Sequence, residues 1–329
     1  MLPLALVAGM TLAGCGKENT TTNENLTGRL TLSFPGFVNP GYTKEFLIDT
    51  LTTLTRSDGG PIGYRIANSG TGENDTLVTA SGAVLRRHFT VTIPDEIASF
   101  SATLYAFVES SAPYYGTSAS VPYSVVRPGL TGDGSITNFK VSSDETFTDP
   151  RNGQAYYLTQ AGGKTWMRSN LAWAGAGRPY QSCVAMSDIF GQYYTWEEAQ
   201  TACPEGWRLP TDAEWTALSE DAQPEGKDIP SLAGKVMADL YFNGNKMWEY
   251  WREVPITDQL GLSAMPVGYA NIIDGSYTFD GLYKYAAFWT SDESGGMGVF
   301  RYIYHSKNVV YRGRISKTDF AASVRCVKQ

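Results

Sequence analysis

The chain has 329 residues, and its 26 Lys and Arg against 33 Asp and Glu give a formal net charge of −7 and a pI of about 5.0. This balance excludes the basic footprint that is typical of nucleic-acid-binding domains. The only histidines, His88 and His305, lie far apart in sequence, so a histidine-based metal site is not expected. We predict neither a metal nor a cofactor.

The first fifteen residues predict an export signal. An apolar, uncharged run from Met1 leads into Leu12-Ala13-Gly14-Cys15, and it is shorter than the roughly 20 residues that a membrane span needs. The segment 1–15 resembles the signal peptide and lipobox of bacterial lipoproteins. The resemblance implies that Cys15 is lipidated, with palmitate as one acyl group, and anchors the chain in a membrane. The alternative is an ordinary secretory signal followed by a chance cysteine. No Lys or Arg precedes the apolar run, which leaves a start further upstream open.

The next segment, 16–25, is polar and has no apolar period, so we expect a flexible tether. Its Lys17-Glu18 pair is similar to the surface-export signals of Bacteroidota lipoproteins. The expected location is therefore the outer membrane, with the cell surface as the favoured side.

Composition divides the remaining chain. All eight tryptophans follow Pro150, and none precedes it. We therefore predict a first domain over 26–137, a polar linker over 138–152 and a second domain over 153–329. The chain's length also favours two domains.

The first domain has the rhythm of short strands. Polar and apolar residues alternate in Arg29–Phe34 and again in Arg87–Ile93, and Gly-rich or Pro-containing turns separate such runs. This pattern predicts an all-β sandwich, either immunoglobulin-like or similar to the fimbrillin-like domains of Bacteroidota. Its expected role is that of a stalk, with an assembly domain as the alternative.

Two helix starts can be located in the second domain. Thr195-Trp-Glu-Glu198 and Thr211-Asp-Ala-Glu214 both fit the capping box, in which a threonine hydroxyl and a glutamate satisfy each other's backbone N–H groups. We predict helices over about 196–203 and 212–219. A long irregular stretch is expected over 241–298. Strands are expected at 288–290, 299–304, 309–312 and 322–327, so the domain is predicted to be α+β.

Five ordered sequence blocks carry a family resemblance. They are Gly163–Leu171, Gly191–Trp196 with Ala202–Trp215, Gly261–Tyr269, Phe288–Ser291 and Ser323–Lys328. Together they resemble the Fibrobacter succinogenes major paralogous domain family. The resemblance implies a C-type-lectin-like fold on secreted and lipid-anchored proteins, with no general activity attached to it.

The cysteines allow one disulfide after lipidation of Cys15. Three thiols remain, at Cys183, Cys203 and Cys326, and an exported chain meets a disulfide-permissive compartment. The family resemblance implies a bridge from Cys203 to Cys326. Pairing of one of these with Cys183 is the alternative.

No catalytic constellation is visible, and we predict that the protein is not an enzyme. His88 and His305 fall in different predicted domains, and no glycine-rich phosphate loop precedes a helix. The glutamates near 197 and 214 are explained by helix starts. Gln223-Pro224-Glu225 only partly resembles the calcium and sugar motif of C-type lectins, so calcium-dependent sugar binding is not predicted.

A binding surface remains, and the irregular stretch is its expected place. Aromatic and acidic side chains suit sugars or protein partners, and the tentative ligand-binding residues are Trp248, Trp251, Asp258, Tyr269 and Asp274. The predicted function is that of a surface lipoprotein in adhesion, with a lectin-like domain that binds a glycan or a protein ligand. The alternative is a structural subunit at the tip or base of a fimbria-like assembly, with other fimbrial subunits as partners.

Overall fold

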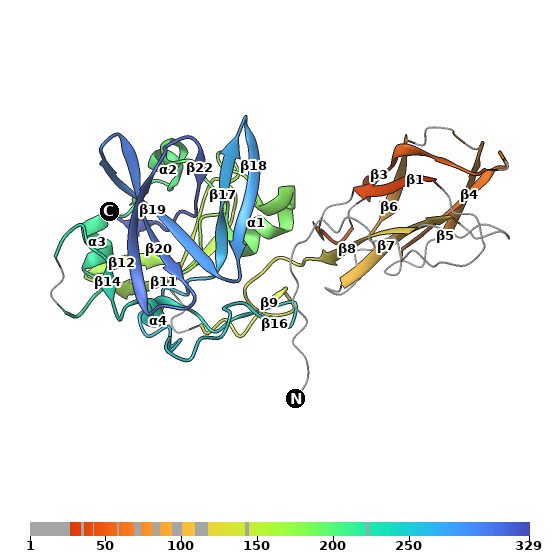
Figure 1. The fold of residues 1–329 in the computed structure, drawn as a ribbon. Helices are drawn as coiled ribbons and strands as arrows, with labels where there is room; N and C mark the ends of the chain where they lie inside the picture. The colour runs from red at the N-terminus through yellow and green to blue at the C-terminus, as the bar shows by residue number, and fades with distance from the viewer. Residues whose placement is uncertain are drawn as a thin grey trace. The chain divides into compact units, whose positions relative to one another are not determined.

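The computed structural model describes the chain from Thr27 onward, with gaps at 34–35, 42, 58, 69–73, 81, 83–85, 94–100, 109–117, 142–144 and 222–223. The predicted signal, the lipidation site Cys15 and the tether lie outside the described residues. The chain divides into an N-terminal unit, Met1–Val125, and a C-terminal unit, Val126–Gln329, shown in Figure 1. Within the described part, no helix has the length and apolar character required to cross a bilayer.

The described elements of the N-terminal unit are all strands, in keeping with the alternation of its sequence. In β4, for example, Ile62 and Tyr64 are buried on either side of the half-buried Gly63. One sheet has the order β1-β3-β6 and the other β2-β8-β7-β4-β5. The strands are β1 (Thr27–Ser33), β2 (Phe37–Val38), β3 (Thr43–Thr55), β4 (Ile62–Asn68), β5 (Asn74–Thr79), β6 (Arg86–Thr92), β7 (Ser101–Val108) and β8 (Ser118–Val125).

The C-terminal unit combines short helices with three sheets. The helices are η1 (Tyr180–Ser182, a 3₁₀ turn), α1 (Val184–Phe190), α2 (Trp196–Ala202), α3 (Asp212–Thr216) and α4 (Ala233–Val236). The strands are β9 (Ile136–Thr137), β10 (Thr146–Thr148), β11 (Ala155–Ala161), β12 (Lys164–Met167), β13 (Trp207–Arg208), β14 (Ile229–Pro230), β15 (Tyr241–Phe242), β16 (Asn245–Lys246), β17 (Val267–Ile273), β18 (Ser276–Leu282), β19 (Tyr285–Ser294), β20 (Met297–Tyr304), β21 (Val309–Ile315), β22 (Phe320–Ala321) and β23 (Val327–Lys328).

The largest sheet of this unit runs β14-β21-β20-β19-β17-β18, and β22 pairs with β17 beside this path. A second sheet runs β10-β11-β12-β23-β13, and a small third one joins β9, β15 and β16. All pairings in the C-terminal unit's ladders are antiparallel except β17 with β19, which meet in parallel at Gly268 and Ala286.

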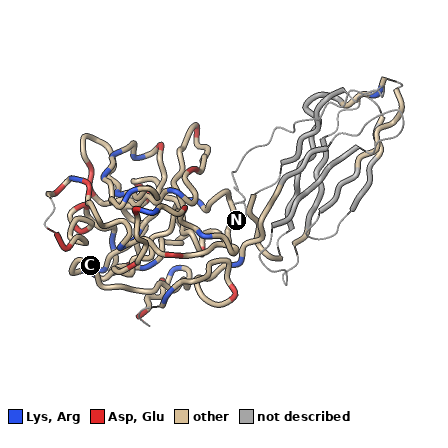
Figure 2. Tube along the Cα trace, turned by 60° about the horizontal axis from the view of Figure 1, so that its bottom comes forward, with Lys and Arg blue, Asp and Glu red and all other residues tan. Residues whose placement is uncertain are grey.

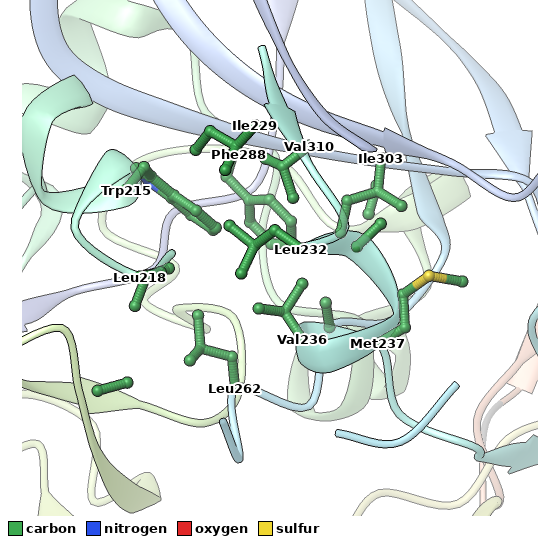
Figure 3. Close-up of a cluster of buried hydrophobic side chains, with 14 of the residues drawn as sticks. Trp215, Leu218, Ile229, Leu232, Val236, Met237, Leu262, Phe288, Ile303 and Val310 are labelled. Carbon is green, nitrogen blue, oxygen red and sulfur yellow. The ribbon is translucent and has the colours of Figure 1, made fainter. Parts of the chain in front are cut away.

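The largest sheet has a hydrophobic core on each face. In β19, Ala286 and Phe288 belong to one buried cluster, and Ala287 and Trp289 belong to the other. Alternate residues of a strand point to opposite faces, so a strand that is buried on both sides has a continuous apolar sequence. Figure 3 shows the first cluster, in which Trp215 lies beside Phe288 and side chains near α4 approach those of β20 and β21.

The two predicted helix starts are confirmed. Thr195 caps α2 and Thr211 caps α3, and each forms the full reciprocal capping box with Glu198 or Glu214. Helix α2 ends one residue early because Cys203 is extended before Pro204. Helix α3 ends at Thr216, three residues before its predicted end, and a tight turn in which the N–H of Leu218 donates to Trp215 O follows it.

The disulfide between Cys203 and Cys326 is present, with a Cα–Cα distance of 6.0 Å. It joins the end of α2 to the segment before β23, and its Cys326 end lies in a fully buried cluster. Cys183 stays outside the bridge as a buried thiol, and burial raises the pKa of that thiol to about 11. The alternative pairing with Cys183 is therefore wrong.

The predicted fold class, an α+β C-type-lectin-like domain, is also wrong. Helices α1 to α4 have only four to seven residues each, whereas β19 alone has ten, and the strands form three sheets. The stretch predicted to be irregular contains the hairpin β17–β18 and the start of the β19–β20 pair. Asp274 and Gly275, both with positive φ, form the two-residue turn of this hairpin.

The residue at which the chain divides into the two units also differs from the predicted domain boundary. Residues 126–137, assigned by composition to the first domain, belong to the C-terminal unit, and Ile136 of β9 is fully buried opposite Phe242 of β15. The predicted linker contributes as well, because β10 pairs with β11 and the buried Asp149 binds Arg151. Composition missed these contacts because the segments are polar in sequence, and because β9 pairs with β15 more than one hundred residues further along the chain.

Candidate functional site: an exposed aromatic loop

Among the tryptophans, all of which lie in the described part of the chain, Trp251 is the one with an exposed side chain. It is 44% exposed, whereas Trp166, Trp207, Trp215, Trp248 and Trp289 are buried. Trp173 and Trp196 are half-buried, and each is covered by a cation: Arg151 lies 4.2 Å from the ring of Trp173 and Lys317 lies 4.3 Å from that of Trp196. The accessible indole surface is therefore concentrated at Trp251.

Trp251 projects from residues 249–253, which we call the aromatic loop. Its neighbour Tyr250 is 74% exposed. The loop is fixed at both ends: the buried Trp248 donates its indole N–H to Ala264 O at 2.9 Å, and the buried Val254 donates its backbone N–H to Trp251 O at 3.1 Å. Two large aromatic side chains are therefore held in solvent by a loop whose flanking residues are packed in the core.

His305 supports the loop from below its surface. The imidazole is buried, and it contacts Trp251 at 5.8 Å between ring centroids with an interplanar angle of 87°. It also contacts Tyr304 at 4.5 Å and 70°. Tyr304, at the end of β20, is itself 39% exposed. The aromatic loop and the end of the sheet are thus joined through His305.

Tyr304 belongs to a row of partly exposed tyrosines that crosses the sheet. We call this row the tyrosine face, and it consists of Tyr269, Tyr285, Tyr302, Tyr304 and Tyr311. Tyr285 stacks on Tyr302 at 5.1 Å and 11°, and Tyr302 stacks on Tyr311 at 5.0 Å and 17°. Neighbouring rings of the row cover one another, and such cross-strand aromatic pairs stabilise a sheet. Burial raises the pKa of Tyr285 well above its ordinary value, so its phenol stays neutral.

Charged groups border the aromatic loop. A carboxylate oxygen of Glu249 lies 3.6 Å from the ammonium of Lys284 and 3.6 Å from Nε2 of His305. Both distances exceed those of hydrogen bonds, so Glu249 keeps oxygens that can accept from a ligand, and Lys284 can donate. Figure 2 shows basic and acidic residues interleaved along the described chain rather than gathered in a basic stripe.

The site has groups that suit the recognition of a ligand. An aromatic surface with one carboxylate and one ammonium can pack against a ligand and hydrogen-bond its hydroxyl groups. Among the residues that the structure describes, no cluster of three or more His, Cys, Asp or Glu side chains could hold a metal.

The five residues predicted to bind ligand do not form one site. Trp251 lies in the aromatic loop, and Tyr269 belongs to the tyrosine face, where its ring contacts Tyr285 at 5.1 Å. Trp248 is buried in the core. Asp258 accepts from the N–H and hydroxyl of Ser263 and lies 3.6 Å from the buried Arg168, so it organises a loop. Asp274 is exposed in the β17–β18 turn.

Sequence reasoning missed His305 and most of the tyrosine face. One signal was present, because aromatic residues recur at every second position of Phe300-Arg-Tyr302-Ile-Tyr304 and so must share one face of a strand. The role of His305 had no such signal, since it depends on a loop more than fifty residues earlier in the chain.

The chain can be compared with curated proteins and with protein families. No curated protein matches the chain. The sequence model of the Fibrobacter succinogenes major domain family matches residues 159–328. This segment is just over half of the chain, and it contains all of the aromatic loop and the tyrosine face. The match confirms the family resemblance that the five sequence blocks carry. The chain belongs to the Fibrobacter succinogenes major domain family.

Proposed function

We propose that the protein is an exported, lipid-anchored adhesion protein whose C-terminal unit binds a glycan at the aromatic loop. The observation that carries the proposal is the exposure of Tyr250 and Trp251 on a loop whose ends are fixed in the core. Exposed aromatic side chains on a rigid support lose little conformational entropy when a ligand binds, which favours a binding role.

A glycan fits this loop better than an extended protein surface does. Sugar rings present apolar C–H faces that pack on indole and phenol rings, and their hydroxyl groups need nearby acceptors and donors. Trp251 supplies the ring, Glu249 an acceptor and Lys284 a donor. The site is an exposed surface, so single contacts would be weak, and a lipid-anchored array of copies would gain avidity.

The tyrosine face is assigned a supporting role. A sugar that stacks on an aromatic ring needs an uncovered ring face, and Tyr302 is stacked against both Tyr285 and Tyr311. Its ring faces are therefore occupied by protein. We place the stacking contact at Tyr250 and Trp251, with Tyr304 completing the surface.

The alternative, a structural subunit in a fimbria-like assembly, is favoured by a different observation. Strand β18 ends the largest sheet, and an edge strand can pair with a strand of another chain. A chain that binds no glycan but forms oligomers that depend on β18 would support this role.

Replacing Trp251 with alanine is expected to weaken glycan binding about 10- to 30-fold, the loss that is typical of a central aromatic contact in an interface. The full chain would be screened on a glycan array and its retained glycans titrated by calorimetry. Because the side chain is exposed, the free energy of unfolding should change by no more than about 1 kcal/mol.

The matched control is Ile273→Ala. Ile273 is also an exposed apolar residue, at 66%, but it lies at the tip of the β17–β18 hairpin. Unchanged glycan affinity in this variant together with loss in Trp251→Ala supports the aromatic loop. Equal affinities for Trp251→Ala and the unsubstituted chain would rule the loop out as the site.

The lipid anchor predicts a separate result. Cells that express the chain and grow with an alkyne-labelled palmitate analogue should give a labelled protein in the outer-membrane fraction, because acylation at Cys15 would supply the membrane attachment. Cys15→Ala should remove the label and release the chain from the membrane. Cys183→Ala serves as the control for thiol labelling, and a label that persists in Cys15→Ala would contradict the anchor.

A further inference from the structure

His305 is a buried residue that contacts two exposed aromatic side chains. Its ring contacts Trp251 of the aromatic loop and Tyr304 of β20. Its backbone N–H donates to Lys284 O at 2.9 Å, which fixes its position at the end of the sheet. The loop backbone is tied to the same region, because Glu249 N–H donates to Tyr283 O at 3.1 Å.

The surroundings of His305 are suited to the neutral imidazole. Nδ1 is buried and has no hydrogen-bond partner among the described residues. A neutral imidazole can leave one nitrogen as an unprotonated acceptor, whereas the imidazolium donates from both. A proton on each nitrogen would therefore bury a donor without an acceptor at Nδ1, which destabilises this arrangement.

The charged and titratable groups around the imidazole act in opposite directions. From the aromatic loop, the Glu249 carboxylate lies 3.6 Å from Nε2 and favours the charged ring. From the turn between β18 and β19, Lys284 disfavours it, and from β20 the Tyr304 phenol packs against it. Glu249 is shared with Lys284, so its support for the imidazolium is incomplete.

We infer that His305 is the positioning residue that holds Trp251 in its ligand-binding orientation, and that protonation of His305 releases the aromatic loop. The consequence for glycan binding rests on the proposed function. The link between His305 and Trp251 does not, because it can be measured without a ligand.

The direction of the pH effect follows from burial. Desolvation lowers the pKa of His305 below its ordinary 6.5, against the opposing effect of Glu249. The folded state therefore binds fewer protons than the unfolded state in this range. The stabilisation of the loop by neutral His305 should therefore be fully present above pH 6.5. It should decrease as the pH falls from 6.5 to the lowered pKa of His305.

The test uses the full chain labelled with 5-fluorotryptophan and followed by fluorine NMR from pH 8 to pH 4.5. The Trp251 resonance, assigned by its loss in Trp251→Phe, should shift in a single transition with a midpoint below 6.5. In His305→Phe, which keeps an aromatic ring but cannot titrate, the resonance should stay constant. The Trp173 resonance serves as the internal control. A Trp251 resonance that does not titrate, or that titrates equally in His305→Phe, overturns the inference.

A second variant keeps the test decisive if His305→Phe does not fold. Glu249→Gln removes the carboxylate that favours the imidazolium, so the midpoint should move to lower pH; an unchanged or higher midpoint would contradict the inference. If the chain binds a glycan, its affinity for that glycan should fall several-fold when the pH is lowered from 7.5 to 5. Titration of Trp251 in a chain that binds no glycan would refute only the proposed function. Glycan binding without titration of Trp251 would refute only this inference.

Discussion

Replacing both Cys203 and Cys326 with alanine is expected to lower the free energy of unfolding of the C-terminal unit by about 4–5 kcal/mol. The bridge closes a loop with a sequence separation of 123, and loop closure of this length restricts the unfolded chain by about that amount in the chain-entropy model. The loss is large because the free energy of unfolding of a whole domain is only about 5–15 kcal/mol.

Urea unfolding followed by tryptophan fluorescence measures this effect on the C-terminal unit alone, because all eight tryptophans lie there. The reduced, unsubstituted chain should unfold at nearly the same urea concentration as the double variant. The matched control is Cys183→Ala, which removes a buried thiol outside the bridge and should cost much less. Coincident unfolding curves for the double variant and the oxidised chain would contradict the prediction.

Asp212→Ala is expected to cost about 3–5 kcal/mol, because it leaves a buried guanidinium without its counter-charge. The carboxylate of Asp212, at the first position of α3, accepts from Arg301 Nε at 2.6 Å and from Arg312 Nε at 2.9 Å. The Arg301 side chain is fully buried, and its desolvation lowers the pKa of the guanidinium while Asp212 opposes that shift. The Asp212 carboxylate of α3 therefore stabilises the buried positive charge of Arg301 in β20, and the ion pair connects α3 to the largest sheet.

The double variant Asp212→Ala with Arg301→Met distinguishes the contribution of the ion pair to the free energy of unfolding from that of side-chain packing. Removing both charges should recover much of the stability lost in Asp212→Ala, because methionine fills part of the volume without a charge. Urea unfolding of the single and double variants gives the coupling free energy. A loss of less than about 1 kcal/mol in Asp212→Ala, or no recovery in the double variant, would show that the pair does not hold α3 to the sheet.

The sequence predicted those elements correctly whose stabilising interactions join residues close together in the chain. Thr195 and Thr211 identify two helix starts because a capping box involves residues only three apart. The Asp274-Gly275 turn is equally local, and its two residues could have identified the β17–β18 hairpin. The disulfide partners were found through family resemblance, since three cysteines alone allow several pairings.

Burial over long distances could not be predicted in the same way. Trp248 and Trp251 are three residues apart and chemically identical, yet one is buried and the other exposed. What separates them is Ala264, whose carbonyl accepts the indole N–H of Trp248, and His305, which contacts Trp251. The same limitation contributed to the wrong α+β fold class, because β12 pairs with β23 from the far end of the chain and neither sequence reveals the pairing.

The most direct test of the glycan site is a fluorine NMR titration of the 5-fluorotryptophan-labelled chain at pH 7.5 with a glycan retained on the array. If the ligand stacks on the aromatic loop, the resonance of Trp251 should move with a saturable dependence on glycan concentration while those of Trp173 and Trp196 stay in place. Movement of Trp173 or Trp196 with Trp251 unaffected would place the ligand elsewhere and contradict the account.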